Sequence, residues 1–272
     1  MQSKIDKYIK KIKKDGYAII PNLISVSECE KFKYILNKDY EKYKKKYFSN
    51  KNTGLANKKS EKVVFNLHNK NLIWFQLFEN KKILNILNII LKEGSYKNSE
   101  PYYLNNISAR SPLKGHKGQL MHLDSNLAGV NYNIIVNVMW LLDDFNEKNG
   151  STFIVPKSHL KKKYANNNKI IKNKILIKAK KGSVLIFNAN LWHGGSKKQD
   201  NNSRWAVLLG YARWFIKPSF DYMKNTPKKI FNNLTNKQKS LLGFDLIAPK
   251  DEFTRLTRRS SDYEIPENYI LK

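Results

Sequence analysis

The feature that most constrains the fold of this chain is a series of short apolar segments separated by turn-forming residues. The series runs from Tyr102 to Arg213, and turn chemistry at 112–118, 143–150 and 181–182 divides it. Short strands at such intervals are typical of a β-sandwich or β-barrel. The pattern predicts a mainly β core over residues 101–215, with strands at 102–109, 119–122, 134–142, 152–155, 174–178, 183–187 and 204–213.

The segment before this core carries helical signals instead. Apolar spacing over 5–12 predicts a first helix, and Ser25 with Glu28 forms a capping box that opens a second one. The other elements expected in residues 1–100 are short strands at 17–20 and 63–65 and two helices within 72–91.

The segment after the core also reads as helical. Thr235 and Gln238 form another capping box, and Gly243 is expected to end the helix that this box opens. A chain of 272 residues is expected to form a single domain. Its expected parts are N-terminal helical and strand support (1–100), the β core with the site (101–215), and a C-terminal helix and tail (216–272).

Charge and cysteine content narrow the class of protein. A formal net charge of +29 would suit a polyanionic partner, but the basic residues spread along the whole chain, so nucleic-acid binding is not expected. No apolar run has the length of a membrane span or a signal peptide, and the expected location is the cytoplasm. The single cysteine, Cys29, excludes an intramolecular disulfide and a cysteine-based metal site.

Three potential metal ligands stand in the predicted core. His122 and Asp124 would point to the same face of a strand, because side chains alternate along it. His193 follows the apolar segment 183–187 and precedes Gly194-Gly195, where a backbone can approach a ligand closely. Two imidazoles and one carboxylate form the facial arrangement of non-haem Fe(II) oxygenases. A His-x-Asp triplet alone is a weak signal, and the third ligand and its context strengthen it.

Arg204 opens the last predicted strand of the core. If its side chain faces the interior of a barrel, the buried guanidinium needs an anion as its partner. A guanidinium fork matches a carboxylate through two parallel hydrogen bonds. The sequence therefore predicts an anion site near the metal ligands.

The order of these motifs resembles the phytanoyl-CoA dioxygenase (PhyH-like) family of Fe(II)/2-oxoglutarate oxygenases. The resemblance covers nearly the whole chain, and Lys157 departs from it because the family usually has glycine there. The matching segments are Asp15-Gly-Tyr-Ala-Ile-Ile-Pro21, Met121-His-Leu-Asp124, Trp140-Leu-Leu-Asp-Asp144, Asn149-Gly-Ser-Thr152, Val155-Pro-Lys-Ser-His159, Gly182-Ser-Val-Leu-Ile-Phe187, Leu191-Trp-His193, Asn202-Ser-Arg204 and 234–243.

This resemblance implies a double-stranded β-helix, the cupin-like jelly roll, with helices outside one sheet. It implies that His122, Asp124 and His193 hold Fe(II), and that Arg204 pairs with the distal carboxylate of 2-oxoglutarate. The implied reaction uses O2 to hydroxylate a small metabolite and releases succinate and CO2. A small anion is one candidate for this metabolite. Related halogenases lack the carboxylate ligand, so Asp124 favours hydroxylation or another oxidation over halogenation.

Three further residues are candidates for contact with 2-oxoglutarate. Asn105 could donate hydrogen bonds to it, Trp140 could line its pocket, and Thr152 is the third candidate. Strand hydrogen bonding for Asn105 and core packing for Trp140 are the ordinary alternatives. Gln119 could face the substrate or cap a turn.

The remaining histidines, His68, His116 and His159, are not expected to bind the metal, and His159 is expected to fix a loop. Substrate anchors are less determined, because a surface ion pair is the favoured interpretation of each candidate. These candidates are Arg110, Arg213, Arg255, Arg258 and Arg259.

Two other functions stay open. One is a cupin-type metalloenzyme that uses no 2-oxoglutarate, for which Arg204 would have no role. The other is a basic module that binds nucleic acid or another polyanion, in which the histidines and Asp124 would have no purpose. The sequence identifies neither the substrate, nor the hydroxylated carbon, nor the oligomeric state.

Overall fold

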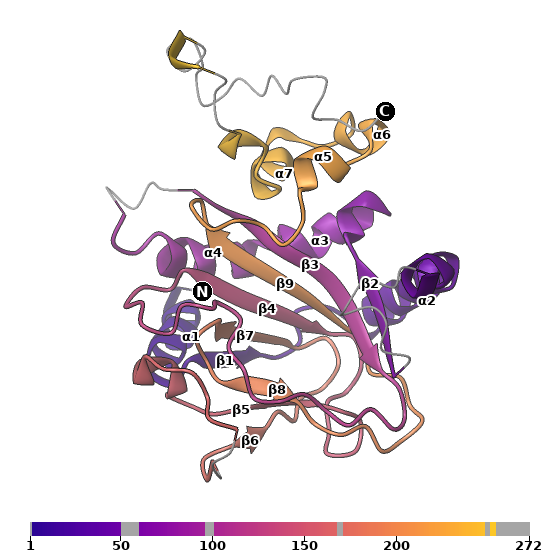
Figure 1. Ribbon diagram of the computed structural model, residues 1–272, viewed down its shortest axis with the longest axis vertical. Coiled ribbons are helices and arrows are strands. Elements are labelled where there is room, and N and C mark those ends of the chain that lie inside the picture. Colours follow the sequence, from indigo (N-terminus) through magenta and orange to yellow (C-terminus); the bar gives the residue numbers. More distant parts are fainter. Residues whose placement is uncertain (1, 50–59, 96–100, 168–170, 248–250, 254–272) are drawn as a thin grey trace.

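The larger of two antiparallel sheets forms the centre of the protein, as the computed structural model shows for residues 2–49, 60–95, 101–167, 171–247 and 251–253 (Figure 1). The strand order of the larger sheet is β1 (Tyr17–Ile20), β7 (Val184–Asn188), β4 (Ile135–Leu141), β9 (Ala206–Arg213), β3 (Tyr102–Pro112) and β2 (Glu61–Phe65). The smaller sheet has the order β6 (Ile175–Leu176), β5 (Thr152–Ile154) and β8 (His193–Gly195). The expected mainly β, jelly-roll fold with flanking helices is confirmed.

The two faces of β4 show how the larger sheet separates a helical side from a site side. All seven residues of β4 are buried, and all of them except Asn137 are apolar. Val138 and Trp140 pack in the core cluster formed with the helices, whereas Asn137 and Met139 face the smaller sheet. This alternation follows from the pleat, which turns successive side chains to opposite faces.

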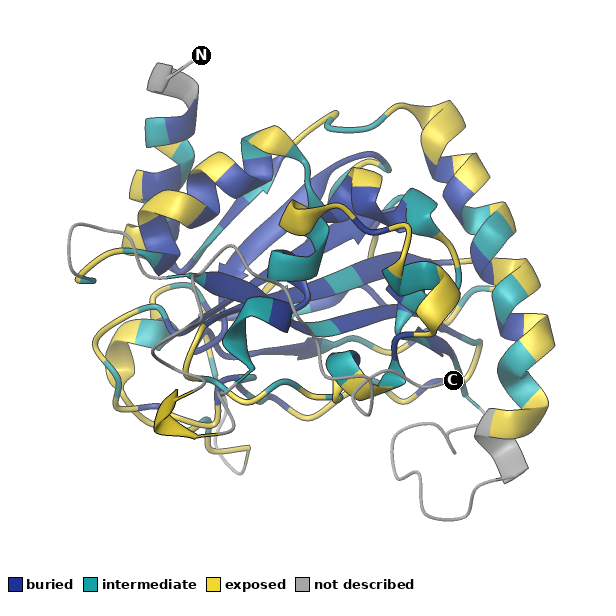
Figure 2. Ribbon diagram, turned by 90° about the horizontal axis from the view of Figure 1, so that it is seen from above, coloured by how far each residue is buried: buried dark blue, intermediate teal, exposed yellow. Residues whose placement is uncertain are grey.

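Helices cover the outer face of the larger sheet. They are α1 (Gln2–Asp15), α2 (Val26–Ser49), α3 (Phe75–Phe78) and α4 (Lys81–Leu91), with single 3-10 turns at Leu67–Asn69 and Leu72–Trp74. Ser25 N donates to Glu28 Oε2 over 2.7 Å and Glu28 N to Ser25 Oγ over 3.2 Å, which confirms the capping box. Figure 2 shows buried residues along the strands and exposed residues on the outer helix surfaces.

The C-terminal part forms short helices at one end of the larger sheet, at the top of Figure 1: α5 (Tyr222–Asn225), α6 (Lys228–Phe231) and α7 (Asn236–Leu241). Thr235 and Gln238 make the expected capping box, and Gly243 takes a φ of 84° after the helix ends. Leu242 and Phe244 join the main core cluster. Among the described residues, no helix is long and apolar enough to cross a membrane.

The strands differ from the prediction in several places, among them the expected strand at 174–178, which is reduced to Ile175–Leu176. The expected strand at 119–122 is reduced to one bridge, between His122 and His193, because the Gln119 side chain accepts the Gly195 N–H that a longer ladder would use. Strand β8 was not expected, since two of its three residues are glycines, which have low β propensity. Arg255, Arg258 and Arg259 lie outside the described residues.

Candidate functional site

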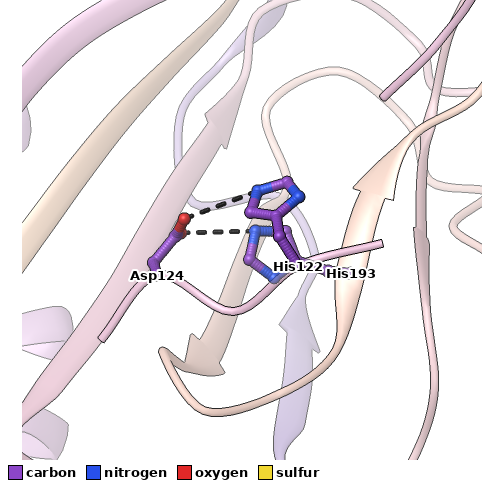
Figure 3. A group of neighbouring side chains, drawn as sticks. All are labelled: His122, Asp124 and His193. Carbon is purple, nitrogen blue, oxygen red and sulfur yellow. Dashed lines mark ion pairs between the residues drawn. The ribbon is translucent and has the colours of Figure 1, made fainter. Parts of the chain in front are cut away.

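His122, Asp124 and His193 converge between the two sheets (Figure 3). Asp124 Oδ1 lies 3.5 Å from His122 Nε2, and Asp124 Oδ2 lies 3.3 Å from His193 Nε2. All three residues offer ligand atoms within 4.8 Å of one another, which makes them the group of potential metal ligands found in the described part of the chain. The His193 side chain is only 7% exposed, whereas those of His122 and Asp124 are 39% and 32% exposed, so one side of the group is open.

Backbone contacts hold the two imidazoles in the orientation that a metal ligand needs. His122 and His193 exchange two backbone hydrogen bonds of 2.9 Å, which fixes their strands side by side. Nδ1 of His122 donates to the Leu120 carbonyl over 2.8 Å, and Nδ1 of His193 donates to the Leu191 carbonyl over 2.9 Å. In the neutral imidazoles each Nε2 therefore carries the lone pair, which is the tautomer that binds a metal. This donor set fits a divalent ion such as Fe(II).

Asp124 comes from a bend rather than a strand, and two hydrogen bonds place it. Its N–H donates to the Ala189 carbonyl over 2.8 Å, which ties the bend to the segment before His193. Asn137 Nδ2 donates to Asp124 Oδ2 over 2.7 Å from the adjacent strand β4. Asn137 was missed as a site residue in the sequence, although a single amide inside an apolar strand was a usable signal.

The electrostatics of the three groups keep the carboxylate ionised. Burial raises the pKa of Asp124, but His193, His122 and the Asn137 amide together outweigh it and lower this pKa to about 2. Burial lowers the pKa of His193, and the Asp124 carboxylate more than reverses this, so that the pKa is raised. Burial and the neighbouring His193 lower the pKa of His122. At neutral pH the site therefore presents an anionic oxygen between two imidazoles.

Arg204 is buried in the same space. It is 7% exposed, its guanidinium carbon lies 4.8 Å above the Phe145 ring, and its Nε has no hydrogen-bond partner among the described residues. Burial lowers its pKa to about 10, opposed by the charges of Glu61 and Asp143, and at neutral pH it stays a cation. A buried cation without a paired anion is costly unless a ligand supplies one.

Asp143 fixes the backbone on both sides of Arg204. Asp143 Oδ2 accepts from the Ser203 hydroxyl and from the Trp205 N–H, both over 2.8 Å. The N–H of Arg204 itself donates to Ser111 Oγ over 3.2 Å. Lys33 Nζ lies 2.6 Å from Asp143 Oδ1 and balances its charge. The position of the guanidinium thus depends on a carboxylate that does not touch it.

The three potential ligands and Arg204 line one cavity of about 150 Å³. Thr152 lies in its wall, where its hydroxyl is 3.8 Å from Met139 Sδ, so the structure brings this candidate to the site. Gln119, Arg110 and His116 also line the cavity. The other lining residues are Glu61, Asn106, Pro112, Met139, Gly150, Phe187, Gly194, Gly195, Ser196, Ala206 and Leu208.

Asn105 and Trp140 are not brought to the cavity. Trp140 is fully buried in the core cluster on the helical side, three positions from Asn137 and therefore on the opposite face of β4. Asn105 stands at an irregularity in the pairing of β3 with β9 and packs against Gly210. It is the next residue, Asn106, that lines the cavity.

The other polar candidates have structural partners. His159 Nε2 donates to the Lys13 carbonyl over 3.1 Å, as expected for a residue that fixes a loop. His68 is fully buried and packs edge-on against Tyr222. Arg213 donates to the carbonyls of Asn133 and Glu93, so it braces backbone segments rather than facing the cavity.

Comparison with known proteins gives a family and a fold. The family model described as phytanoyl-CoA dioxygenase (PhyH) matches residues 12–206. Dioxygenase af480 of Aspergillus fumigatus is 22% identical over 193 residues, which are 68% of this chain and 59% of that protein. The uncharacterized protein Rv1501 of Mycobacterium tuberculosis is 26% identical over 109 residues, 40% of each chain. The matches span less than two thirds of the length of these relatives.

Among solved structures, HygX of Streptomyces hygroscopicus, crystallised with nickel and 2-oxoglutarate bound, has a similar fold. The TM-score is 0.59 at 17% sequence identity, and the match covers 78% of this chain and 88% of HygX. HygX has also been crystallised with nickel, 2-oxoglutarate and hygromycin B. At this identity the similarity establishes the fold.

Proposed function

We propose that this chain, which belongs to the phytanoyl-CoA dioxygenase family, is an Fe(II)- and 2-oxoglutarate-dependent dioxygenase that hydroxylates a small metabolite. One observation carries the proposal. The group of His122, Asp124 and His193 opens into the same cavity as the guanidinium of Arg204, whose Nε has no hydrogen-bond partner among the described residues. A metal centre and a buried cation in one enclosed space suit a bifunctional anion such as 2-oxoglutarate.

Each residue has a defined role in this proposal. Nε2 of His122, Nε2 of His193 and the Asp124 carboxylate would hold Fe(II), which would supply the reaction with O2 that couples decarboxylation of 2-oxoglutarate to oxidation of the substrate. Arg204 would bind the distal carboxylate of the co-substrate through its two-point fork. Thr152 lies where it could add a hydroxyl contact. The metal, the co-substrate and the roles of these residues are proposals for this chain.

The apolar part of the cavity wall excludes water. Met139, Phe187 and Leu208 line it beside the polar groups. A dry wall strengthens the attraction between Arg204 and a carboxylate, because the local dielectric is low. It also protects reactive species from side reactions with solvent. Asp124 fills the carboxylate position, which supports hydroxylation rather than halogenation.

The decisive experiment is anaerobic addition of Fe(II) and 2-oxoglutarate to the purified protein. We expect the weak visible charge-transfer band of an iron–2-oxoglutarate chelate. His122→Ala and Asp124→Ala should abolish the band, because each removes one ligand. Glu41→Gln, on the exposed surface of α2, should leave it unchanged. Failure of the wild-type protein to bind either component would refute the proposed function.

A metalloenzyme of cupin type that uses no 2-oxoglutarate is the alternative, and Arg204 separates the two. In the proposed function, Arg204→Ala weakens 2-oxoglutarate binding by about tenfold or more, since a charge-assisted two-point contact is lost. Arg204→Lys should retain part of the affinity, because the charge remains without the fork. Unchanged 2-oxoglutarate affinity in Arg204→Ala would favour the alternative.

A further inference from the structure

A second charged pair lies in the wall of the cavity and is not used by the metal or by Arg204. Arg110 Nη1 donates to Glu61 Oε2 over 3.0 Å. The Glu61 side chain is 6% exposed and that of Arg110 is 21% exposed, so the pair is largely removed from bulk water. Both residues line the same cavity as His122 and Arg204.

Strand register explains why the pair stands beside the anion site. Glu61 on β2 is opposite Pro112 on β3, and Arg110 on β3 is opposite Ala206 on β9. Arg204 precedes Ala206 by two positions, so Glu61 and Arg204 flank Pro112 on one face of the sheet. The charge of Glu61 is accordingly the largest one acting on Arg204. Arg110 lines the same cavity as Arg204 and His122, and its positive charge lowers the pKa of both.

The pair keeps hydrogen-bonding capacity for a ligand. A guanidinium has five N–H donors, and within the described residues only one side-chain hydrogen bond of Arg110 is recorded, the one to Glu61. Glu61 Oε1 accepts no hydrogen bond from the described residues, and neither this oxygen nor the remaining Arg110 N–H groups are fully buried. The cavity wall therefore offers donors and an acceptor side by side.

The sum of charges around the cavity limits what can bind there. Among the described lining residues, Arg110 and Arg204 are cationic, Glu61 and Asp124 are anionic, and with neutral histidines the sum is zero. A divalent metal and the dianion of 2-oxoglutarate cancel each other, so the sum stays zero after both bind. A third reactant with net charge would leave that charge uncompensated in a poorly solvated space.

We propose that the Arg110–Glu61 pair is the substrate subsite, and that it receives a small zwitterion of the amino-acid type, with its carboxylate on Arg110 and its ammonium group on Glu61. This inference rests on the proposed function, of which it names the substrate class. A net anion is disfavoured, because Glu61 already neutralises Arg110. The overall charge of +29 does not decide the matter, since it lies mostly outside the cavity.

The test measures binding to the protein loaded with Ni(II) and 2-oxoglutarate, by calorimetry. The proteinogenic amino acids are titrated first. The tightest binder is then compared with the amine that lacks its carboxylate and with the acid that lacks its ammonium group. We expect both truncated compounds to bind about tenfold more weakly or worse, because each leaves one charged partner unmatched. If no amino acid binds, or if either truncated compound binds as tightly, the proposal is overturned.

Variants of the pair test the assignment of each group. Glu61→Gln should weaken amino-acid binding about tenfold and strengthen binding of the acid that lacks the ammonium group, because Arg110 loses its partner. Arg110→Gln should instead favour the amine that lacks the carboxylate, because Glu61 loses its partner. The double variant leaves no unpaired buried charge, so it keeps the test valid if a single variant fails to fold. It should bind the three compounds without selectivity. The control is Glu41→Gln, which breaks the exposed pair with Lys44 on α2 and should bind all three as wild type does.

Failure of this inference can be told apart from failure of the proposed function. The charge-transfer band tests the metal and the co-substrate, and it needs no third reactant. The ranking of amino acid, amine and acid tests the subsite, and it can be measured on metal-free protein, since Arg110 and Glu61 belong to the chain. If the charge-transfer band is normal but the amine or the acid binds more tightly than the amino acid, the proposed subsite is refuted and the proposed function is not.

Discussion

Asn137 Nδ2 donates to Asp124 Oδ2 over 2.7 Å, and the same oxygen lies 3.3 Å from His193 Nε2. The amide is buried in the middle of β4, so its direction is set by the sheet rather than by solvent. It therefore holds the carboxylate plane toward the two imidazoles. An outer contact of this kind sets the orientation of a metal ligand without binding the metal.

Replacement of Asn137 should weaken metal binding while the fold persists. Asn137→Val keeps β4 apolar and removes the amide, and we expect metal affinity to fall about 10- to 100-fold. Calorimetric titration with Ni(II) measures it. Asn85→Ala, on the exposed face of α4, is the control and should bind as the wild type. Equal affinity in Asn137→Val would show that Asp124 is held by its backbone alone.

Asp143 should act on 2-oxoglutarate through Arg204. Asp143→Ala frees the Ser203 hydroxyl and the Trp205 N–H and lets the Arg204 backbone move, so we expect KM for 2-oxoglutarate to rise about tenfold with kcat little changed. Ser203→Ala removes one of the two contacts and should give a smaller rise. Steady-state succinate formation measures both.

The neighbouring carboxylate gives the matched control for that prediction. Asp144 binds Lys180 and the Lys181 N–H, away from Arg204, so Asp144→Ala should leave KM for 2-oxoglutarate unchanged. A parallel rise in both variants would mean that general destabilisation, not the position of Arg204, causes the effect.

His68 should make stability depend on pH. Burial, with a contribution from Lys70, lowers its pKa to about 3, and neither imidazole nitrogen has a hydrogen-bond partner among the described residues. The unfolded chain takes up a proton below about pH 6.5 and the folded chain does not, so the free energy of unfolding falls as pH falls through this range. The contribution of His68 to the slope of the unfolding free energy against pH approaches about 1.4 kcal/mol per pH unit.

His68→Phe, which can keep the edge-on contact with Tyr222, removes that contribution. Urea denaturation at several pH values between about 6 and 4 should give a shallower slope for the variant than for wild type. Identical slopes would mean that His68 is protonated in the folded protein as readily as in the unfolded chain.

Lys157 should be a point of backbone strain that glycine relieves. Its φ of 65° lies in the left-handed region, which disfavours residues with a Cβ by about 1 kcal/mol or more. Lys157→Gly is expected to raise the free energy of unfolding by about 1 kcal/mol or somewhat less, since glycine also gains entropy in the unfolded chain. Lys157→Ala keeps the Cβ and should give no gain. The urea midpoint of each variant measures the effect.

Much of the site was predictable because it depends on residue identity and order. The potential metal ligands are chemically distinctive residue types, and His122, Asp124, His193 and Arg204 all lie within the range 12–206 that the family model matches. The capping boxes at Ser25 and Thr235 were also predictable, since they depend on contacts within four residues. The extent of the single domain over 1–272 stays a prediction, as the family match covers residues 12–206.

What the sequence by itself determined was the mainly β core and the set of chemical groups available to the site. Which of those groups face the cavity was decided only by the tertiary structure. Strand side chains alternate with a period of two, so Trp140, three positions after Asn137, lies on the helical side of β4. The irregularity in β3 leaves Asn106, not Asn105, in the cavity wall. The pairing of Glu61 with Arg110 arises from register between β2 and β3, which no local pattern encodes.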